Sequence, residues 1–568
     1  MNRFDRLRAM IGHLSLRKPG GGVARARIGL LLCAFACVYV VIAGRLVYLG
    51  FATESATQKA RAAEAVTQAR PDVYDRKGRL IATDVRTPSL FAEPQRIIDV
   101  DEATDLLLKT LPDLDRSELS ARLRSKRYFA WLRREITPEQ QRAIYRLGLP
   151  GIGFLKEYKR VYPNGPMAAH VLGQVNVDNQ GILGLEKWID DRGLGALQRA
   201  GFATNHNLAP VEIALDLDVQ QAVRDEMIAG KARFRAIAAN ALVVDVHSGE
   251  IVSMVSLPDF DPNKPSSPKD PARFNRLMTG VFEMGSTFKA LTTAMALDSG
   301  KITLQSRFDA THPLRYGRHT IHDFHAQRRV LTVPEIFTYS SNIGSARMAL
   351  AMGVDAHQAF LKKMGLLDRL RTELPESAMP LVPNPWKEIN SVTIAFGHGL
   401  SVTPLQAVAA TAALVNGGHL IQPTFLRRTE QEAKANAPRV IKQSTSDMMR
   451  YLMRLNVEVG SARRAEVEGY FVGGKTGTSE KVERGRYAKN KLLTSFMGVF
   501  PADKPRYLVL VMFDEPKREE GASAATSGLN AAPVAGKIIA RIAPLLGIEP
   551  RINLPTAQSM LQLRNAAN

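Results

Sequence analysis

An uncharged apolar run near the N-terminus constrains the fold of the chain more than any other feature. Residues 28–44 read IGLLLCAFACVYVVIAG, Arg27 and Arg45 flank them, and apolar residues continue to Leu49. A run of ~20 apolar residues is long enough to span a bilayer as a helix. We therefore predict one transmembrane helix over residues 28–49, with the charged end of Arg45 reaching the interface.

The charges before this run predict its orientation. Residues 1–27 hold seven basic residues against one acidic residue, Asp5, which gives a net charge of +6. The basic residues are Arg3, Arg6, Arg8, Arg17, Lys18, Arg25 and Arg27. Because basic flanks stay on the cytoplasmic side, we expect a cytoplasmic N-terminal tail and an extracytoplasmic body.

A cleaved signal peptide and a lipid anchor are the alternatives to a retained helix. Ala34-Phe35-Ala36 has the form of a cleavage site, but it lies inside the apolar run rather than after it. Cys33 could carry a lipid, but bulky Leu32 precedes it where a small residue is expected. A buried helix of a soluble protein fits the length and flanks less well. We expect the helix to be retained.

Composition argues against several kinds of site and partner. The two cysteines, Cys33 and Cys37, both lie in the apolar run, so the body has no disulfide framework and no cysteine-based metal site. The net charge of +21 invites a nucleic-acid interpretation, but the chain carries no nucleic-acid-binding motif. A basic body also suits a polyanionic membrane surface or cell wall. We expect no nucleic-acid partner, no metal and no other cofactor.

The first part of the body reads as short strands around a charged helical region. Residues 50–65 are Ala-rich and charged, which favours a helical stalk. Residues 70–82 predict a strand, a turn at Lys77-Gly78 and a second strand. Further features are a charged helical stretch over 101–146, a strand that ends in a turn at 160–165, and a stretch with Gly173, Gly181 and Gly184 that ends at Glu186.

From about residue 205 the pattern changes to that of one large sheet with helices. A hairpin is expected over 241–255, with a turn at 247–249. A mostly helical middle runs from Ser286 to about residue 460. The other expected elements are strands at 211–217, 470–478, 493–500 and 507–513 and helices at 219–229 and 530–545. The hairpin and the last three strands would form a sheet with helices around it, an α/β sandwich.

The predicted fold class is therefore a multidomain α/β (α+β) chain. It combines a transmembrane helix, a β-rich N-terminal domain, and a larger domain whose antiparallel sheet is flanked by helices. The expected boundaries are a basic tail at 1–27, the helix at 28–49, an N-terminal pedestal at 50–205, the large domain at 206–545 and a tail at 546–568.

Ser286 and Lys289 form the first candidate catalytic motif. Ser286-Thr287-Phe288-Lys289 opens a helical run, and residues i and i+3 share a helix face. The Lys289 amine could then reach the serine hydroxyl, and desolvation would lower the pKa of the lysine so that it could take the serine proton. The spacing alone is weak evidence, because an ordinary helix start has the same form.

Two further motifs follow in the chain. Ser340-Ser341-Asn342 offers a hydroxyl that can relay protons and an amide that can bind a substrate amide, although alone it is typical of a helix N-cap. Lys475-Thr476-Gly477-Thr478 ends a predicted strand. Here Gly477 would let a substrate backbone lie against the strand edge, Lys475 would supply positive charge, and Thr476 and Thr478 would supply hydroxyl donors for a carboxylate.

The three motifs together, in this order, are those of penicillin-binding proteins and β-lactamases. The chain resembles a class B penicillin-binding protein of the cell-division type from about residue 30 to 545. The segments that carry the resemblance are 274–276, 281–289, 340–344, 396–399, 403–406 and, in the N-terminal domain, 70–78 and 160–163. Asn342 favours division, because elongation-type relatives usually have Asp there. Met284 departs from the usual Pro and His398 from the common Tyr.

The resemblance implies a peptidoglycan D,D-transpeptidase of the bacterial inner membrane. Such enzymes cross-link stem peptides that end in D-Ala-D-Ala through a serine acyl-enzyme, and they are the targets of β-lactams. In relatives the oxyanion hole consists of two backbone N–H groups, which here are those of Ser286 and Thr478. No glycan-polymerising domain fits before residue 205, which implies a separate multi-span polymerase and other division proteins as partners.

Four other functions stay open. An elongation-type transpeptidase and a β-lactamase would use similar site chemistry, although the anchor and the pedestal argue against a β-lactamase. A D,D-carboxypeptidase would differ only in using water as the acceptor. A catalytically silent β-lactam sensor or division scaffold would keep the fold, but the complete set of motifs argues against it.

Overall fold

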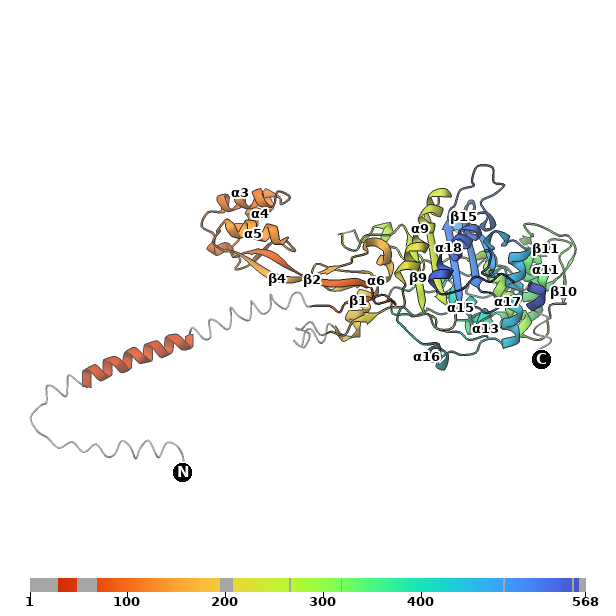
Figure 1. The fold of residues 1–568 in the computed structure, drawn as a ribbon, viewed down its shortest axis with the longest axis horizontal. Coiled ribbons are helices and arrows are strands. Elements are labelled where there is room, and N and C mark those ends of the chain that lie inside the picture. The colour runs from red at the N-terminus through yellow and green to blue at the C-terminus, as the bar shows by residue number, and fades with distance from the viewer. Residues whose placement is uncertain are drawn as a thin grey trace, which may run out of the picture. The chain divides into compact units, whose positions relative to one another are not determined.

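The structure is a computed structural model that describes residues 29–48, 69–194, 208–264, 267–317, 319–483, 486–553 and 556–560. It divides into two compact units, Met1–Val66 and Thr67–Asn568 (Figure 1). The predicted cytoplasmic tail and helical stalk lie outside the described residues.

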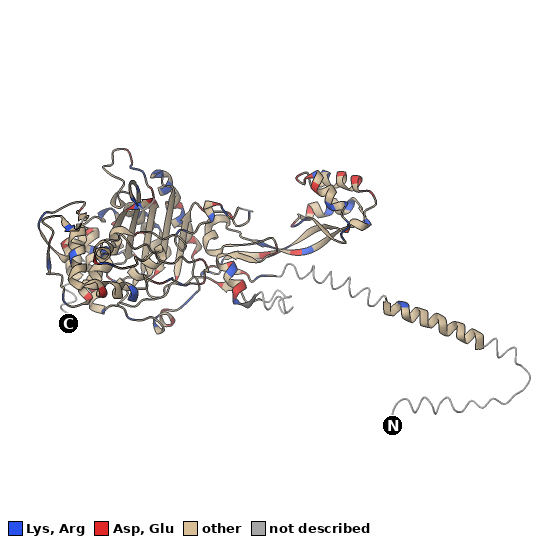
Figure 2. Cartoon of the chain, turned by 180° about the vertical axis from the view of Figure 1, so that it is seen from behind, with Lys and Arg blue, Asp and Glu red and all other residues tan. Residues whose placement is uncertain are grey.

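The described part of the first unit is the helix Gly29–Tyr48, which has 20 residues and a mean hydropathy of 2.4. By length and composition it can cross a membrane. Figure 2 shows it almost free of charged residues, whereas both signs are interspersed over the coloured part of the second unit. The prediction of a helix over 28–49 is confirmed to within one residue at each end.

The second unit begins with the predicted turn between two strands. Strand β1 (Val73–Tyr74) pairs with the antiparallel strand β2 (Leu80–Ala92) and with the parallel strand β7 (Val211–Glu212). Between β1 and β2, the Asp75 carboxylate accepts the backbone N–H groups of Lys77 and Arg79, while Gly78 takes a positive φ of 76°. The turn therefore follows from its aspartate and its glycine.

Helices and strands alternate in the region expected to be helical over 101–146. Strand β2 also pairs with β3 and β4, and the three helices pack on these strands. The elements are α3 (Val100–Thr110), α4 (Arg116–Leu123), β3 (Ala130–Arg133), α5 (Pro138–Arg146) and β4 (Ile152–Val161). The expectation of a helical stretch was wrong at β3, because its alternation of buried and half-buried side chains spans only four residues.

Short elements follow in the glycine-punctuated stretch. They are η2 (Gly165–Ala168), α6 (Ala169–Leu172), β5 (Gln174–Val175), β6 (Gly181–Leu183), α7 (Gly184–Ile189) and η3 (Asp190–Leu194). Gly173 is required by close packing, since a Cβ atom there would lie 1.9 Å from the carbonyl oxygen of Leu183. The glycines thus let β5 and β6 approach each other.

The rest of the second unit is built on a five-stranded antiparallel sheet in the order β14-β15-β16-β8-β9. The strands are β8 (Ala238–Asp245), β9 (Ile251–Leu257), β14 (Gly473–Glu483), β15 (Arg486–Phe500) and β16 (Tyr507–Asp514). All residues of β8, β9 and β16 are buried, as expected for a sheet that is covered on both faces. The predicted hairpin and the three late strands are confirmed, and β15 begins seven residues before its predicted start. Strand β14 begins at Gly473 and runs on to Glu483, so the expectation that Lys475–Thr478 end a strand was wrong.

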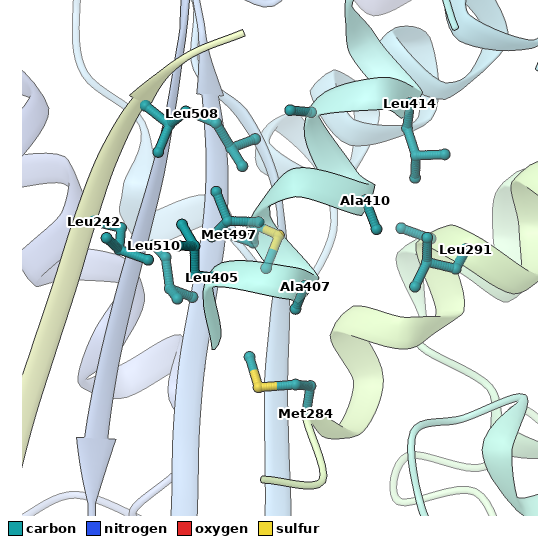
Figure 3. Packing of buried hydrophobic residues seen from close by; sticks show 14 of the residues in the cluster. Leu242, Met284, Leu291, Leu405, Ala407, Ala410, Leu414, Met497, Leu508 and Leu510 are labelled. Atoms are coloured by element: carbon teal, nitrogen blue, oxygen red, sulfur yellow. The ribbon is translucent and has the colours of Figure 1, made fainter. Parts of the chain in front are cut away.

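Helices cover both faces of this sheet. Helices α9 (Leu217–Arg233) and α18 (Ala531–Leu545) pack with one face, as one hydrophobic cluster shows. On the other side, α10 (Lys289–Asp298), α15 (Pro404–Val415) and α17 (Gln443–Glu458) belong to a second, larger cluster. Figure 3 shows Leu510 and Met497 of the strands beside Leu405 of α15. The predicted α/β sandwich is confirmed. Helix α10, which begins at Lys289, belongs to the helical layer of the larger cluster.

The helical middle contains further short elements. The helices are α11 (Val333–Thr338), α12 (Asn342–Met352), α13 (Val354–Lys363), α14 (Glu388–Ile394) and α16 (Glu430–Ala435), with the turns η4 (Pro271–Arg273), η5 (Gly285–Phe288), η6 (Arg463–Ala465) and η7 (Ser527–Leu529). Two small strand pairs, β10 (Arg307–Asp309) with β13 (Val330–Thr332) and β11 (Leu314–Tyr316) with β12 (His319–Ile321), precede α11.

Candidate active site

The residues around Ser286 form a tight turn that leads into helix α10. Ser286 lies in η5, and Lys289 is the first residue of α10. Gly285 has a φ of 54°, and a Cβ atom there would lie 2.9 Å from the carbonyl oxygen of Thr478. Gly477 is similarly confined, since its Cβ would lie 2.8 Å from the carbonyl oxygen of Met284. Two glycines therefore let the Ser286 turn lie directly against strand β14.

Two buried lysines converge on one hydroxyl group. The Lys289 Nζ donates to Ser340 Oγ at 3.0 Å and to the Ser340 carbonyl oxygen at 2.5 Å. The Lys475 Nζ donates to the same Ser340 Oγ at 3.0 Å. Each lysine is 1% exposed. The structure thus brings one residue of each sequence motif into a single hydrogen-bonded group.

The electrostatics of this group disfavour two full positive charges. Burial, together with the positive charge of Lys475, lowers the pKa of Lys289 well below its usual value, while Asp323 opposes the shift. Burial lowers the pKa of Lys475 to about 7. Because the Ser340 oxygen accepts from both lysines, its own proton is free to be donated elsewhere. Neutral amines and a hydroxyl can exchange protons in such a group.

Asp323 holds the second motif in place, and the sequence did not indicate it. Its carboxylate accepts the Ser341 hydroxyl at 2.7 Å and the Ile343 backbone N–H at 2.9 Å. Ser341 is in turn the N-cap of α12 and accepts the N–H of Gly344. Ser340 just before it has a φ of 56°, an uncommon conformation for a residue with a side chain. A lone aspartate in a loop carries no spacing signal that could have revealed this role.

Asn342 lies at the start of α12, and its amide faces the loop before that helix. Its Nδ2 donates to the His322 carbonyl oxygen at 2.8 Å. Among the described residues, this amide makes no hydrogen bond to Lys289 or Lys475. The loop of residues 322–323 therefore binds two consecutive residues of the second motif, Ser341 and Asn342.

The third motif lines strand β14 with hydroxyl groups held by partners elsewhere in the chain. The Thr476 and Ser461 hydroxyl oxygens are 2.6 Å apart, and Thr478 Oγ1 accepts the backbone N–H of Ser527 at 3.2 Å. Neither Ser461 nor Ser527 belongs to a motif that the sequence singles out. Among the residues that the structure describes, no group of three or more His, Cys, Asp and Glu side chains could hold a metal ion.

Comparison with known proteins decides the family. Residues 239–540 match the penicillin-binding protein transpeptidase domain, and residues 65–190 match the penicillin-binding protein dimerisation domain. The chain belongs to the class B penicillin-binding proteins. The resemblance predicted from the motifs is thus confirmed.

Named relatives of this penicillin-binding protein span most of its length. It is 39% identical to the probable peptidoglycan D,D-transpeptidase FtsI of Caulobacter vibrioides, over 87% of this chain and 84% of the relative. It is 32% identical to the probable peptidoglycan D,D-transpeptidase PenA of Neisseria gonorrhoeae, over 94% and 95%. The peptidoglycan D,D-transpeptidase FtsI of Escherichia coli is 30% identical, over 92% of each chain. With the apolar N-terminal helix, these relatives indicate a membrane-anchored protein.

The departure at Met284 has a structural explanation. Met284 has a φ of −79°, within the range that proline requires, so either residue fits this backbone. Its side chain is buried in the larger hydrophobic cluster, and its carbonyl oxygen accepts the Thr287 hydroxyl at 2.8 Å. In this penicillin-binding protein, methionine therefore adds packing where proline would add rigidity.

Proposed function

We propose that this penicillin-binding protein is a septal peptidoglycan D,D-transpeptidase that acts through an acyl-enzyme on Ser286. The observation that carries the proposal is the pair of buried lysines, Lys289 and Lys475, that share the Ser340 hydroxyl next to the Ser286 turn. Burial that lowers lysine pKa values is typical of general bases. The names of the relatives support the same reaction.

In the first half-reaction, Ser286 Oγ forms a bond to the carbonyl carbon of the penultimate D-Ala. The neutral Lys289 amine takes the serine proton, and the backbone N–H groups of Ser286 and Thr478 stabilise the oxyanion. The C–N bond then breaks, and the departing amine of D-Ala takes a proton through the Ser340 hydroxyl. The product is an ester on Ser286, and a β-lactam would form an analogous ester by opening its ring, with the amine still attached to the acyl group.

In the second half-reaction, an amine of a neighbouring stem peptide attacks the ester carbonyl. It loses a proton to the same group of residues, and Ser286 leaves with its proton restored. Lys475 and the hydroxyls of Thr476 and Thr478 bind the substrate carboxylate, Gly477 gives the peptide access to the strand edge, and the Asn342 amide binds a substrate amide. The reaction requires no cofactor.

Ser286→Ala tests this assignment. The variant should lose all labelling by a fluorescent penicillin and all cross-linking of a stem-peptide donor to an amine acceptor, in detergent-solubilised full-length protein. Its thermal unfolding should match that of the wild type, because the Ser286 side chain makes no hydrogen bond to any other residue that the structure describes. Full labelling of this variant would refute the assignment.

The apolar helix orients the protein and contributes to partner binding in this proposal. The basic tail at 1–27 stays in the cytoplasm, the helix at 28–49 is retained, and the pedestal (50–205) and transpeptidase domain (206–545) lie outside, followed by the tail at 546–568. A separate glycan polymerase and other division proteins would be the partners. Small residues that allow close helix packing in lipid are Gly29, Ala34, Ala36, Ala43 and Gly44.

Exchange of the apolar helix tests whether this helix binds a partner in the membrane. Replacing residues 28–49 by an unrelated membrane helix should preserve penicillin acylation but abolish support of cell division. A chimera that fully supports division would reduce the helix to a tether. A mature N-terminus beyond residue 36, found by mass spectrometry, would contradict retention of the helix.

A further inference from the structure

Glu283 lies three residues before Ser286 and joins three segments that surround it. Its Oε1 accepts the backbone N–H of Gly399 at 2.8 Å and the hydroxyl of Tyr487, on strand β15, at 3.2 Å. Its backbone carbonyl oxygen accepts the Ser479 hydroxyl at 2.7 Å. One residue thus contacts the turn at 397–399 and both strands of the β14–β15 pair.

These contacts flank the two backbone N–H groups assigned to the oxyanion hole. The turn at 397–399 also binds the Ser286 segment directly, since the Gly285 N–H donates to the Gly397 carbonyl oxygen at 3.2 Å. On the other side, Ser479 is the residue that follows Thr478. A shift of Glu283 would therefore change the distance between the N–H of Ser286 and the N–H of Thr478.

The hydrogen bonds of Glu283 need an oxygen acceptor but no negative charge. Both side-chain donors bind Oε1, whereas Oε2 is buried and has no hydrogen-bond partner among the described residues. Burial raises the pKa of Glu283, which its two hydrogen bonds only partly oppose. An amide oxygen could replace Oε1 without loss of either hydrogen bond.

We propose that Glu283 is a positioning residue that fixes the spacing of the oxyanion N–H groups of Ser286 and Thr478. The inference rests on the proposed function of these two residues. Stabilisation of an oxyanion depends on the position of its donors, and a displacement of about 1 Å can cost ~10²-fold in rate. Glu283 acts through hydrogen bonds from the Gly399 N–H and from the Tyr487 and Ser479 hydroxyl groups, and it touches no substrate.

The experiment compares full-length variants in detergent by their acylation with a fluorescent penicillin at saturating and sub-saturating concentrations. Glu283→Ala should lower the limiting acylation rate by about 10–100-fold and leave the dissociation constant of the initial complex nearly unchanged. Glu283→Gln should restore the wild-type rate. Glu483→Ala is the matched control, because Glu483 binds Lys491 within the same strand pair, and its rate should stay normal.

Ser479→Ala keeps the proposal testable if Glu283→Ala does not fold. It removes only the hydrogen bond between Glu283 and the residue after Thr478, and it should also lower the limiting rate. A wild-type rate in Ser479→Ala together with a wild-type or unfolded Glu283→Ala would overturn the proposal. So would a folded Glu283→Gln as slow as Glu283→Ala, since the residue would then act through its charge and not through its hydrogen bonds.

These outcomes are separable from failure of the proposed function. If mass spectrometry finds no penicillin adduct on Ser286 in the wild type, the proposed function and the role of Glu283 both fail. If the adduct forms on Ser286 and the Glu283 variants behave as the wild type, only the role of Glu283 fails.

Discussion

Two regions of this molecule bury positive charge, and they do so in opposite ways. In the N-terminal part, an ion cluster consists of Arg70, Arg160, Asp84, Glu186 and Asp190. In the transpeptidase domain, the lysine pair Lys289 and Lys475 shares a hydroxyl group. The arginines have carboxylate partners, whereas no ion pair to either lysine occurs in the part of the chain that the structure describes.

The pKa shifts follow this difference. Burial alone would raise the pKa of Glu186, but Arg160 and Arg70 bring it below its usual value. Burial opposes the charge of Arg160, yet Glu186 and Asp84 raise its pKa. For the lysine pair, burial lowers both pKa values. Paired charges keep their ionised forms and serve the fold, whereas lysines without carboxylate partners become available for proton transfer.

Lys289→Met is expected to give the largest effect. It keeps an unbranched apolar chain but removes the base, so the rate of acylation by penicillin should fall by ~10²–10⁴-fold, as measured by stopped-flow fluorescence. Lys481→Met is a matched control, since this lysine lies on the same sheet but pairs with Asp514 and Glu515. A wild-type rate of acylation in Lys289→Met would show that this buried lysine is not the base.

Glu186→Gln tests whether the ion cluster of the N-terminal part stabilises the fold. It removes the charge of the fully buried Glu186 carboxylate and leaves two arginines under-compensated, so the free energy of unfolding should fall by ~3–5 kcal/mol in urea titrations. Acylation of the folded variant should remain normal. Glu118→Gln, which breaks an exposed pair with Arg122, should cost no more than ~1 kcal/mol. Equal losses in both variants would mean that burial of the cluster is unimportant.

Lys475→Met tests the coupling of the two lysines through the pH dependence of acylation. The charge of Lys475 contributes to the lowered pKa of Lys289, so the rise of the acylation rate with pH should move to higher pH in this variant. An unchanged pH profile would show that the two lysines titrate independently.

The same variant should also change stability. Lys475 has a pKa of about 7 in the folded chain and ~10.4 in the unfolded chain. Between these values the unfolded state binds more protons, so this lysine makes the wild type more stable as pH rises. At and below pH 7 the buried charge of Lys475 destabilises the wild type, and Lys475→Met removes this cost. The free energy of unfolding of the variant should therefore exceed that of the wild type most at and below pH 7, and the difference should shrink toward pH 10. Thermal unfolding across this window measures it.

The sequence alone predicted features that depend on neighbouring residues. Apolar runs and turn signals located the membrane-length helix, the hairpin of β8 and β9 and the late strands, because burial periodicity and turn chemistry are local properties. The three motifs predicted the chemistry and the family in the same way. Where the local pattern was short and masked by charge, as in β3, the prediction was wrong.

Only the tertiary structure decided which of these residues meet and how they ionise. Lys289 and Lys475 reach Ser340 from positions 51 and 135 residues away. Asp323 and Glu283 belong to the site through hydrogen bonds that no spacing encodes. The physical reason is that a pKa depends on desolvation and on nearby charges, and both arise from the packing of distant segments. The residue types of the site can be read from the chain, but their distances and burial are properties of the fold.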